Sequence, residues 1–194
     1  MKHISIEGFD GVGKTTICNI LSDKLGYEFV EKPLKYLFNA EGEEKEYIRI
    51  RDYINQESPK NRPLSALFYG FGNTFLYHKF KDENIITDRH ILSNYAWSHD
   101  ESSEKVYELL YDLLGEPKHT FILKGSKDVI KKRLIHRNYT DSDLKKLDLV
   151  DTVYSKMIQC ATKYNMNYKI IDTDHKTPEV IVEEIMSFIE VNNE

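Results

Sequence analysis

A glycine-rich stretch close to the first residue limits the possible folds more than any other feature of the chain. Residues 8–15 fit the spacing G-x-x-x-x-G-K-T. The stretch follows an apolar run, Lys2–Glu7, and precedes a pattern typical of a helix, Thr16–Leu25. We therefore expect a strand that turns directly into a helix, which is the local setting that this spacing requires.

The glycine-rich loop is suited to hold phosphate oxygens. Glycines let successive backbone N–H groups turn inward, and the N-terminus of the following helix adds partial positive charge. Lys14 is expected to reach the outer phosphates of a nucleoside triphosphate, and Thr15 to ligate Mg²⁺. The residues expected to bind this triphosphate are Gly8, Gly11, Val12, Gly13, Lys14, Thr15 and Thr16. The alternative is a glycine-rich turn with a solvated lysine.

Short apolar runs alternate with helical patterns along the rest of the chain. The five runs that predict strands are Lys2–Glu7, Tyr27–Glu31, Asn84–Asp88, His119–Lys124 and Tyr168–Asp172. One stripe with helical spacing, which fits a buried helix face, comprises Leu64, Leu67, Phe68, Phe71 and Phe75. Strands that alternate with helices imply a parallel sheet covered on both faces, and 194 residues suit one domain spanning 1–194.

The charge balance and the cysteines exclude some functions. The chain carries 27 Lys and Arg residues against 32 Asp and Glu residues, which argues against a general nucleic-acid binder. No run approaches the roughly 18 apolar residues of a membrane span, and the first strand begins too close to Met1 for a signal peptide. Cys18 and Cys160 form no metal-type pair. We therefore expect a cytoplasmic protein with neither nucleic acid nor membrane as a partner.

An acidic residue, Asp10, lies inside the loop that should hold phosphates. Its carboxylate would repel those phosphates unless it faced a second substrate, for example through a sugar hydroxyl or a Mg²⁺-bound water. The alternative is an aspartate that stabilises the turn by bonding to its own backbone.

A second polar pair, Asp88 and Arg89, falls at the C-terminal end of the predicted strand Asn84–Asp88. Ligands bind at this end of the strands in open α/β sheets. An aspartate there can order Mg²⁺ through water, and an arginine can grip phosphate with its planar fork. The alternative is a structural ion pair.

Together the two stretches resemble the thymidylate kinases, within the P-loop nucleoside and nucleotide kinases. The loop of that family reads much like E-G-x-D-G-x-G-K-T-T, and residues 7–16 read EGFDGVGKTT. Residues 88–97, DRHILSNYAW, match its signature D-R-[aromatic or His]-x-x-S-x-x-A-[Phe or Tyr] except for Trp97. The resemblance implies a three-layer α/β P-loop NTPase fold, whose five-stranded parallel sheet has the order 2-3-1-4-5 with helices on both faces. It also implies transfer of the γ-phosphoryl group of ATP, with Mg²⁺, to dTMP.

The resemblance also assigns roles around the acceptor nucleotide. Asp10 would lie near its sugar and phosphate, Arg89 would hold its phosphate, and Asn94 would approach its base. Trp97 would occupy the aromatic position near the sugar that disfavours a 2′-hydroxyl. The residues expected to act in catalysis are Lys14, Asp10, Arg89, Arg133 and Arg137, and those expected at Mg²⁺ are Thr15 and, through water, Asp88.

The resemblance also assigns roles at the acceptor site to two further aromatic residues. Phe68 matches the residue that stacks on thymine, and Tyr154 matches a position that can approach the acceptor nucleotide. Both side chains also lie in apolar helical stripes, so each fits a helix core equally well.

A cluster of basic residues follows the predicted strand His119–Lys124. Arg133 and Arg137 are four residues apart and share a helix face. Thymidylate kinases place a lid here, at about residues 133–143, and those with Gly after the loop aspartate, as Gly11 is here, generally carry a catalytic arginine in it. The resemblance therefore implies that Arg133 or Arg137 steadies the transferring phosphoryl group. The alternative is a solvated charged helix.

The chain departs from the family in the helical pattern Leu67–Phe75. The family usually has an Asp-Arg pair there, whose arginine holds the acceptor phosphate, but Phe71 and Gly72 stand at those positions. Lys32 or Asn73 could compensate for the missing arginine. Otherwise the acceptor could be a nucleoside, which has no phosphate to hold.

Other functions therefore stay open. One is a deoxynucleoside kinase, which would use a glutamate such as Glu31 as its base, or a kinase for another (deoxy)nucleoside monophosphate. Another is a nucleotide-binding protein without transfer activity, although the N-K-x-D of a GTPase is absent. Members of the family commonly form homodimers through helices beside the sheet, and the predicted helix Leu64–Phe80 could serve as such a surface.

Overall fold

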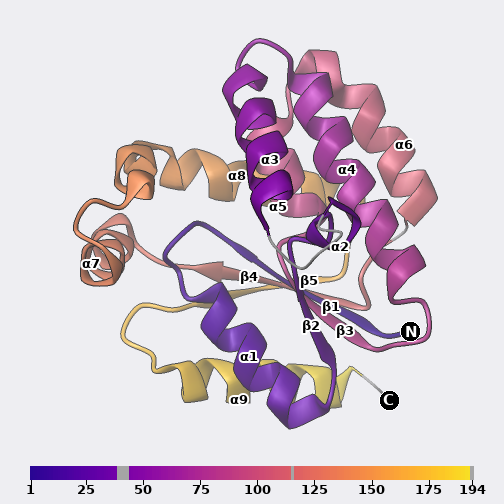
Figure 1. Ribbon diagram of the computed structural model, residues 1–194. Coiled ribbons are helices and arrows are strands. Elements are labelled where there is room, and N and C mark those ends of the chain that lie inside the picture. The colour runs from indigo at the N-terminus through magenta and orange to yellow at the C-terminus, as the bar shows by residue number, and fades with distance from the viewer. Residues whose placement is uncertain (39–43, 115, 193–194) are drawn as a thin grey trace.

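The computed structural model describes residues 1–38, 44–114 and 116–192. Within these ranges the centre is a five-stranded parallel sheet in the order β2-β3-β1-β4-β5 (Figure 1). The strands are β1 (His3–Gly8), β2 (Glu28–Glu31), β3 (Ile85–Asp88), β4 (His119–Lys124) and β5 (Tyr168–Asp172). The expected P-loop kinase fold and its strand order are confirmed.

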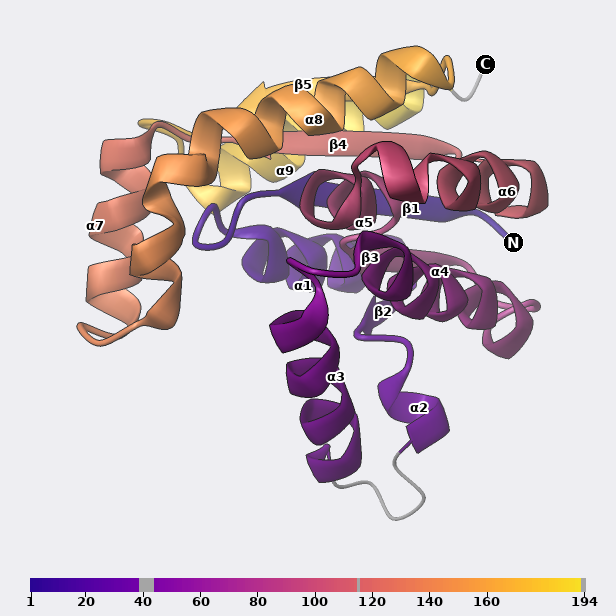
Figure 2. The same ribbon diagram turned by 90° about the horizontal axis from the view of Figure 1, so that it is seen from above.

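Helices cover both faces of the sheet (Figures 1 and 2). One face carries α1 (Lys14–Leu25) and α9 (Pro178–Val191), and the other carries α4 (Arg62–Lys79), α5 (Ile91–Ser98), α6 (Glu104–Leu114) and α8 (Val150–Lys163). The remaining elements are α2 (Lys35–Phe38), α3 (Lys45–Glu57), α7 (Lys127–Arg137) and the 3₁₀ segments η1 (Glu101–Ser103) and η2 (Ser142–Leu149). In the described ranges, no helix has both the length and the apolar character needed to cross a lipid bilayer.

Neighbouring residues of β4 pack into the apolar cores on opposite faces of the sheet, because side chains alternate along a strand. Phe121 and Leu123 belong to the core with α1 and α9, whereas Ile122 belongs to the core with α5 and α8. All three side chains are fully buried. Burial of each contributes about 1.5–3 kcal/mol, so the two apolar layers on either side of the sheet hold it in place.

The prediction that the apolar stripe of α4 forms its buried face is wrong. Leu67 is 52% exposed and Phe71 is 50% exposed. The buried residues of α4 are Ser65, Ala66, Gly70, Gly72, Asn73 and Leu76. A Cβ atom on Gly70 would lie 2.5 Å from Leu110 Cδ1 of α6, so the two helices approach too closely for a larger side chain. This close approach favours small residues on the inner face and leaves larger apolar ones outside.

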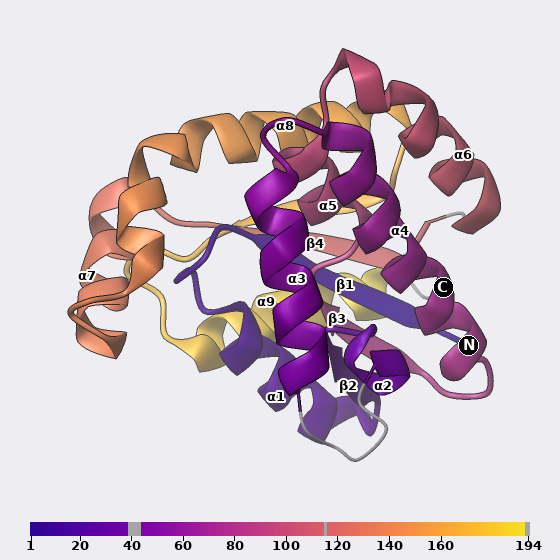
Figure 3. The same cartoon turned by 45° about the horizontal axis from the view of Figure 1, so that its top comes forward.

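The ends of three neighbouring strands bring the predicted polar residues to one edge of the sheet. Glu31 at the end of β2 and Ile6 of β1 both lie opposite Asp88 at the end of β3. The turn from β1 into α1 starts at the same edge, between α7 on one side and α3 on the other (Figures 1 and 3). The fold therefore opens a site between these two helices.

Candidate active site

A cavity of about 1060 Å³ lies at this edge of the sheet. It is lined by the β1–α1 turn, the ends of β2 and β3, and side chains from α3, α4, α5, α7 and η2. Among the described residues of its wall, the basic ones are Lys14, Lys32, Arg51, Arg62, Arg89, Arg133, Arg137 and Lys146, and the acidic ones are Asp10, Glu31, Asp52, Asp88 and Asp143. The cavity is thus basic in a chain whose net charge is −5, as an anionic substrate requires.

Most of the predicted site residues meet in this cavity. Those that line it are Asp10, Gly11, Gly13, Lys14, Thr15, Thr16, Asp88, Arg89, Asn94, Trp97, Arg133 and Arg137. Gly8, Val12, Phe68 and Tyr154 are not among its lining residues. Val12 lines an adjoining cavity of about 540 Å³ between the loop, α7 and α9.

The loop has the backbone that a phosphate cradle needs. Gly11 and Gly13 have φ values of 82° and 104°, which turn the chain through the left-handed region. Gly13 is the N-cap residue of α1, so the N-terminus of that helix faces the loop. Gly8, at the end of β1, lets the start of the loop approach β4 closely. A Cβ atom on Gly8 would lie only 2.6 Å from the carbonyl oxygen of Leu123 on β4.

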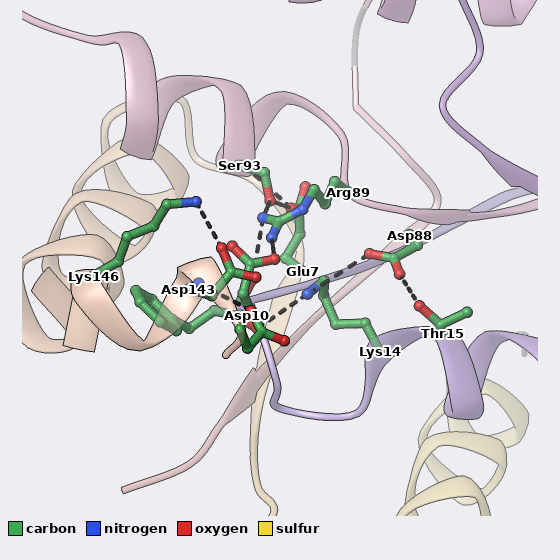
Figure 4. A network of polar contacts seen from close by, with 12 residues as sticks. Glu7, Asp10, Lys14, Thr15, Asp88, Arg89, Ser93, Asp143 and Lys146 are labelled. Carbon is green, nitrogen blue, oxygen red and sulfur yellow. Dashed lines mark hydrogen bonds and ion pairs between the residues drawn. The ribbon is translucent and has the colours of Figure 1, made fainter. Parts of the chain in front are cut away.

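Lys14, Thr15 and Asp88 converge where the loop meets β3 (Figure 4). Thr15 Oγ1 donates to Asp88 Oδ2 at 2.6 Å, and Lys14 Nζ lies 3.8 Å from Asp88 Oδ1. Asp88 Oδ1 is buried and has no hydrogen-bond donor among the described residues. A hydroxyl and a carboxylate oxygen in need of a partner suit Mg²⁺, which typically takes few protein ligands and completes its shell with phosphates and water.

The Asp10 carboxylate accepts a hydrogen bond from the Arg89 guanidinium at the wall of the cavity (Figure 4). The Arg89 guanidinium also donates to Ser93 Oγ at 3.2 Å and to the Gly8 carbonyl at 3.4 Å. Burial raises the pKa of the Asp10 carboxyl, but the charges of Arg89, Lys14 and Lys146 outweigh it and hold that pKa well below its usual range. Asp10 is therefore ionised, and it bonds to Arg89 rather than to its own turn.

Arg89 itself has a φ of 79°, which costs a residue with a side chain about 1–3 kcal/mol. Glu7 stabilises this strained backbone by accepting hydrogen bonds from the residues that follow Arg89. The sequence motifs did not reveal this role of Glu7. Glu7 is fully buried on β1 and accepts from the backbone N–H of His90 at 2.9 Å and of Ser93 at 3.2 Å. Ser5 and Ser93 hydroxyls donate to the same carboxylate. The sequence signal that could have revealed this role was an acidic residue at the end of a run that predicts a buried strand.

Asn94 and Trp97 line the cavity from α5, as the resemblance implies. Asn94 is held on both sides, because its Nδ2 donates to the Ala66 carbonyl at 3.1 Å and its Oδ1 accepts from Tyr107 at 3.1 Å. The Trp97 ring packs on Phe9, with centroids 5.7 Å apart. Both side chains are thus fixed before any ligand binds.

The placement expected for Phe68 is corrected, because its half-buried ring packs edge-on against Tyr69 and does not line the cavity. Adjacent helical residues point about 100° apart, and it is Tyr69 that turns to the cavity and donates to Asn55 Oδ1 at 2.6 Å. Tyr154 is corrected as well. Its buried hydroxyl donates to the Leu123 carbonyl at 3.0 Å and accepts from the Gly125 N–H at 3.2 Å, which makes it a core residue.

Gly72 lines the cavity at the α4 position where the family arginine is expected. A Cβ atom there would lie 3.1 Å from Leu34 Cγ and 3.6 Å from Pro33 Cγ, so Leu34 would have to shift slightly to admit a side chain. Two arginines that the motifs did not indicate line the cavity instead. Arg51 comes from α3, and Arg62 at the start of α4 donates to the Trp97 carbonyl at 2.7 Å.

The two arginines of α7 have different surroundings. The Arg133 guanidinium donates to the carbonyls of Val12 at 3.0 Å and Thr173 at 2.9 Å, and to Thr173 Oγ1 at 3.0 Å. Arg137 is 55% exposed and pairs with Asp141 at 2.5 Å and Asp143 at 3.2 Å. Arg133 therefore fastens α7 to the phosphate loop, while Arg137 bonds to carboxylates of the segment that follows α7.

The family model for thymidylate kinase matches residues 6–185 of this chain. A protein of Thermococcus kodakarensis named "Putative adenylate kinase" is 31% identical over 189 residues, covering 96% of this chain and 84% of that protein. A "Probable thymidylate kinase" of Sulfolobus acidocaldarius is 29% identical over 189 residues, covering 96% of this chain and 95% of that protein.

Solved structures share the fold over nearly the whole chain. A deoxyadenosine kinase from M. mycoides with dCMP and dCDP bound has a TM-score of 0.70 at 20% identity, covering 97% of this chain and 99% of that chain. The thymidylate kinase from Candida albicans has a TM-score of 0.70 at 21% identity, covering 99% of this chain and 92% of that chain.

Proposed function

Because the chain belongs to the thymidylate kinase family and is a nucleotide kinase, we propose that it transfers the γ-phosphoryl group of MgATP to dTMP. The observation that supports this most is that one basic cavity holds both a phosphate-binding loop and Arg89, which pairs with Asp10 of that loop. The loop suits a triphosphate donor, and Arg89 beside it suits the phosphate of the acceptor.

In the proposed reaction the loop N–H groups and Lys14 hold the outer phosphates of ATP, and the ATP base lies in the adjoining cavity beside Pro178 and Ile181. Thr15 and Asp88 would hold Mg²⁺, which neutralises phosphate charge when bound. Catalysis of this kind comes mainly from positioning two anions in line and from stabilising the charge on the transferring group.

A phosphate acceptor suits the residues better than a hydroxyl acceptor does. A phosphate oxygen is already anionic and needs no base, whereas a nucleoside hydroxyl must lose a proton. Asp10 is ionised and committed to Arg89, and Glu31 lies 3.3 Å from the Lys32 ammonium, so neither is a free base. A deoxynucleoside kinase stays the second candidate because Glu31 does line the cavity.

We propose further that residues 133–143 act as a lid and that Arg137, rather than Arg133, steadies the transferring phosphoryl group. Arg137 is exposed at the cavity and pairs with the Asp141 and Asp143 carboxylates, which phosphate oxygens can replace because they carry the same sign of charge. The homodimer expected for the family would use the exposed face of α4, where Leu67 and Phe71 lie.

The test is a panel of acceptors assayed for ADP release with MgATP: dTMP, dUMP, dCMP, dAMP, AMP, and the matching nucleosides. We expect the highest kcat/KM with dTMP. We also expect that Arg89→Ala lowers kcat/KM for dTMP by about 30-fold or more, since it removes a charged partner worth 2–5 kcal/mol. Phosphorylation of thymidine without phosphorylation of dTMP would refute the proposal in favour of a nucleoside kinase.

A further inference from the structure

We infer that Lys146 is a phosphate-binding residue of the acceptor site, and that Asp143 holds it until an acceptor phosphate replaces the carboxylate. The inference deepens the proposed function and rests on it, because it requires an acceptor that carries a phosphate. Neither the family motifs nor the basic cluster of α7 includes this lysine.

Lys146 reaches the cavity from η2, on the side opposite α3. Its ammonium lies 5.5 Å from the centroid of the Trp97 ring, which lines the same cavity. The side chain is 44% exposed, so it is accessible to a ligand. A cation over an indole face is stabilised there without being neutralised. Lys146 therefore presents a charge beside the proposed position of the acceptor sugar.

The same ammonium acts on the Asp10–Arg89 pair. Lys146 is one of the three cations, with Arg89 and Lys14, whose charges keep the Asp10 carboxyl ionised. An anion that bonds to Arg89 would therefore lie within the field of Lys146 as well. Two cations, the guanidinium of Arg89 just after β3 and the ammonium of Lys146 in η2, suit the tetrahedral oxygens of a phosphate.

The carboxylate of Asp143 neutralises the charge that a bound phosphate would neutralise, because it contacts Lys146 (Figure 4). One of its carboxylate oxygens bonds to Lys146 Nζ at 2.7 Å, and the other lies 3.2 Å from Arg137. The backbone N–H of Asp143 donates to Asp141 Oδ1 at 2.9 Å, which fixes the residue at the start of η2. One anion thus holds two cavity cations that would otherwise repel each other.

The glycine at position 72 makes a cation from another element more important. Gly72 has no side chain and so provides no charge for the acceptor phosphate. Arg62 is committed to the Trp97 carbonyl and Ser58, and Arg51 bonds to Asp52, its neighbour in the chain. Lys146 bonds to the Asp143 carboxylate and can exchange it for phosphate, because carboxylate and phosphate carry the same sign of charge.

The test measures binding of dTMP and thymidine by calorimetry, without ATP, to the wild type and to Lys146→Met, which keeps the apolar stem and removes the charge. We expect the Kd for dTMP to rise about 10-fold while the Kd for thymidine stays unchanged. Lys146→Arg should restore most of the dTMP affinity. Lys145→Met is the matched control, because Lys145 is the exposed neighbour and does not line the cavity.

Asp143→Asn tests the second half of the inference. Removing the competing carboxylate should lower the Kd for dTMP about threefold, and a higher Kd would refute the exchange. Equal dTMP affinity in Lys146→Met and the wild type would overturn the role of Lys146 while leaving the proposed function intact. If the wild type phosphorylates and binds nucleosides but no monophosphate, the proposed function itself fails, and the inference with it.

Discussion

At the end of β1 a single residue decides how closely two strands can approach. Gly8 has a φ of 145°, and its missing Cβ would lie 2.6 Å from the Leu123 carbonyl oxygen. That oxygen belongs to the backbone of β4 and cannot move without breaking the sheet. The glycine therefore serves the fold directly and the phosphate loop only through it.

We expect Gly8→Ala to lower the free energy of unfolding by about 2–4 kcal/mol, since it combines backbone strain with overpacking. Gly26→Ala is the matched control. Its φ is also positive, at 66°, but no atom lies within 4 Å of the added Cβ, so only the left-handed backbone cost of about 1–2 kcal/mol applies. Urea denaturation of both variants measures the difference. Equal losses would show that crowding against Leu123 is unimportant.

At the scale of elements, α7 carries two arginines one turn apart that have separate tasks. Arg133 bonds to backbone carbonyls of the phosphate loop and of the segment after β5, so it joins three elements. Arg137 lies at the end of the helix and faces the cavity. The spacing of the two residues places both on one face but does not reveal this division.

We expect Arg137→Ala to lower kcat on the order of 100-fold with little change in KM for ATP, because it removes charge from the transferring phosphoryl group. Arg133→Ala should instead raise the KM for ATP and lower the midpoint of thermal unfolding, since it leaves carbonyls without their donors. Steady-state kinetics and thermal melts of both variants separate the two tasks. The reverse pattern would assign the catalytic arginine to position 133.

The elements also show what sequence patterns can predict. All five strands were predictable because buried parallel strands read as short apolar runs, and His119–Lys124 has the predicted bounds. The buried face of α4 could not be predicted from the sequence. Periodicity locates a stripe, but only the distance between α4 and α6 determines that Gly70 lies inside and Phe71 outside.

At the scale of the whole molecule, the site combines motif residues with residues from segments that carry no motif. Lys14, Asp88 and Arg89 were predictable because the loop and the strand end are contiguous stretches. Arg51 and Lys146 were not, because α3 and η2 reach the cavity only through the tertiary fold. The same tertiary packing buries ionisable groups, and these tie the stability of the whole chain to pH.

His90 is such a group. Burial lowers its pKa to about 3, against an ordinary value of about 6.5. Between these values the unfolded chain binds a proton at this ring that the folded protein does not, so the free energy of unfolding falls as the pH falls. At pH 5 the loss from this residue is about 2 kcal/mol relative to pH 8.

We expect His90→Phe, which keeps an aromatic ring against His3 and Tyr77, to remove that part of the acid destabilisation. Urea titrations at pH 8 and pH 5 measure it as a smaller difference between the two pH values than in the wild type. His78→Gln is the control, since His78 is exposed on α4. An unchanged difference in His90→Phe would contradict the assignment.

The contact between Gly72 and Leu34 bears on how this acceptor site can change over generations. The Cβ atom of an arginine at position 72 would lie 3.1 Å from Leu34 Cγ, so Leu34 would have to shift by a few tenths of an ångström to admit it. A smaller residue at position 34 would relieve this crowding. Laboratory evolution toward tighter acceptor binding would therefore reach an arginine on α4 more readily when position 34 is free to change with it.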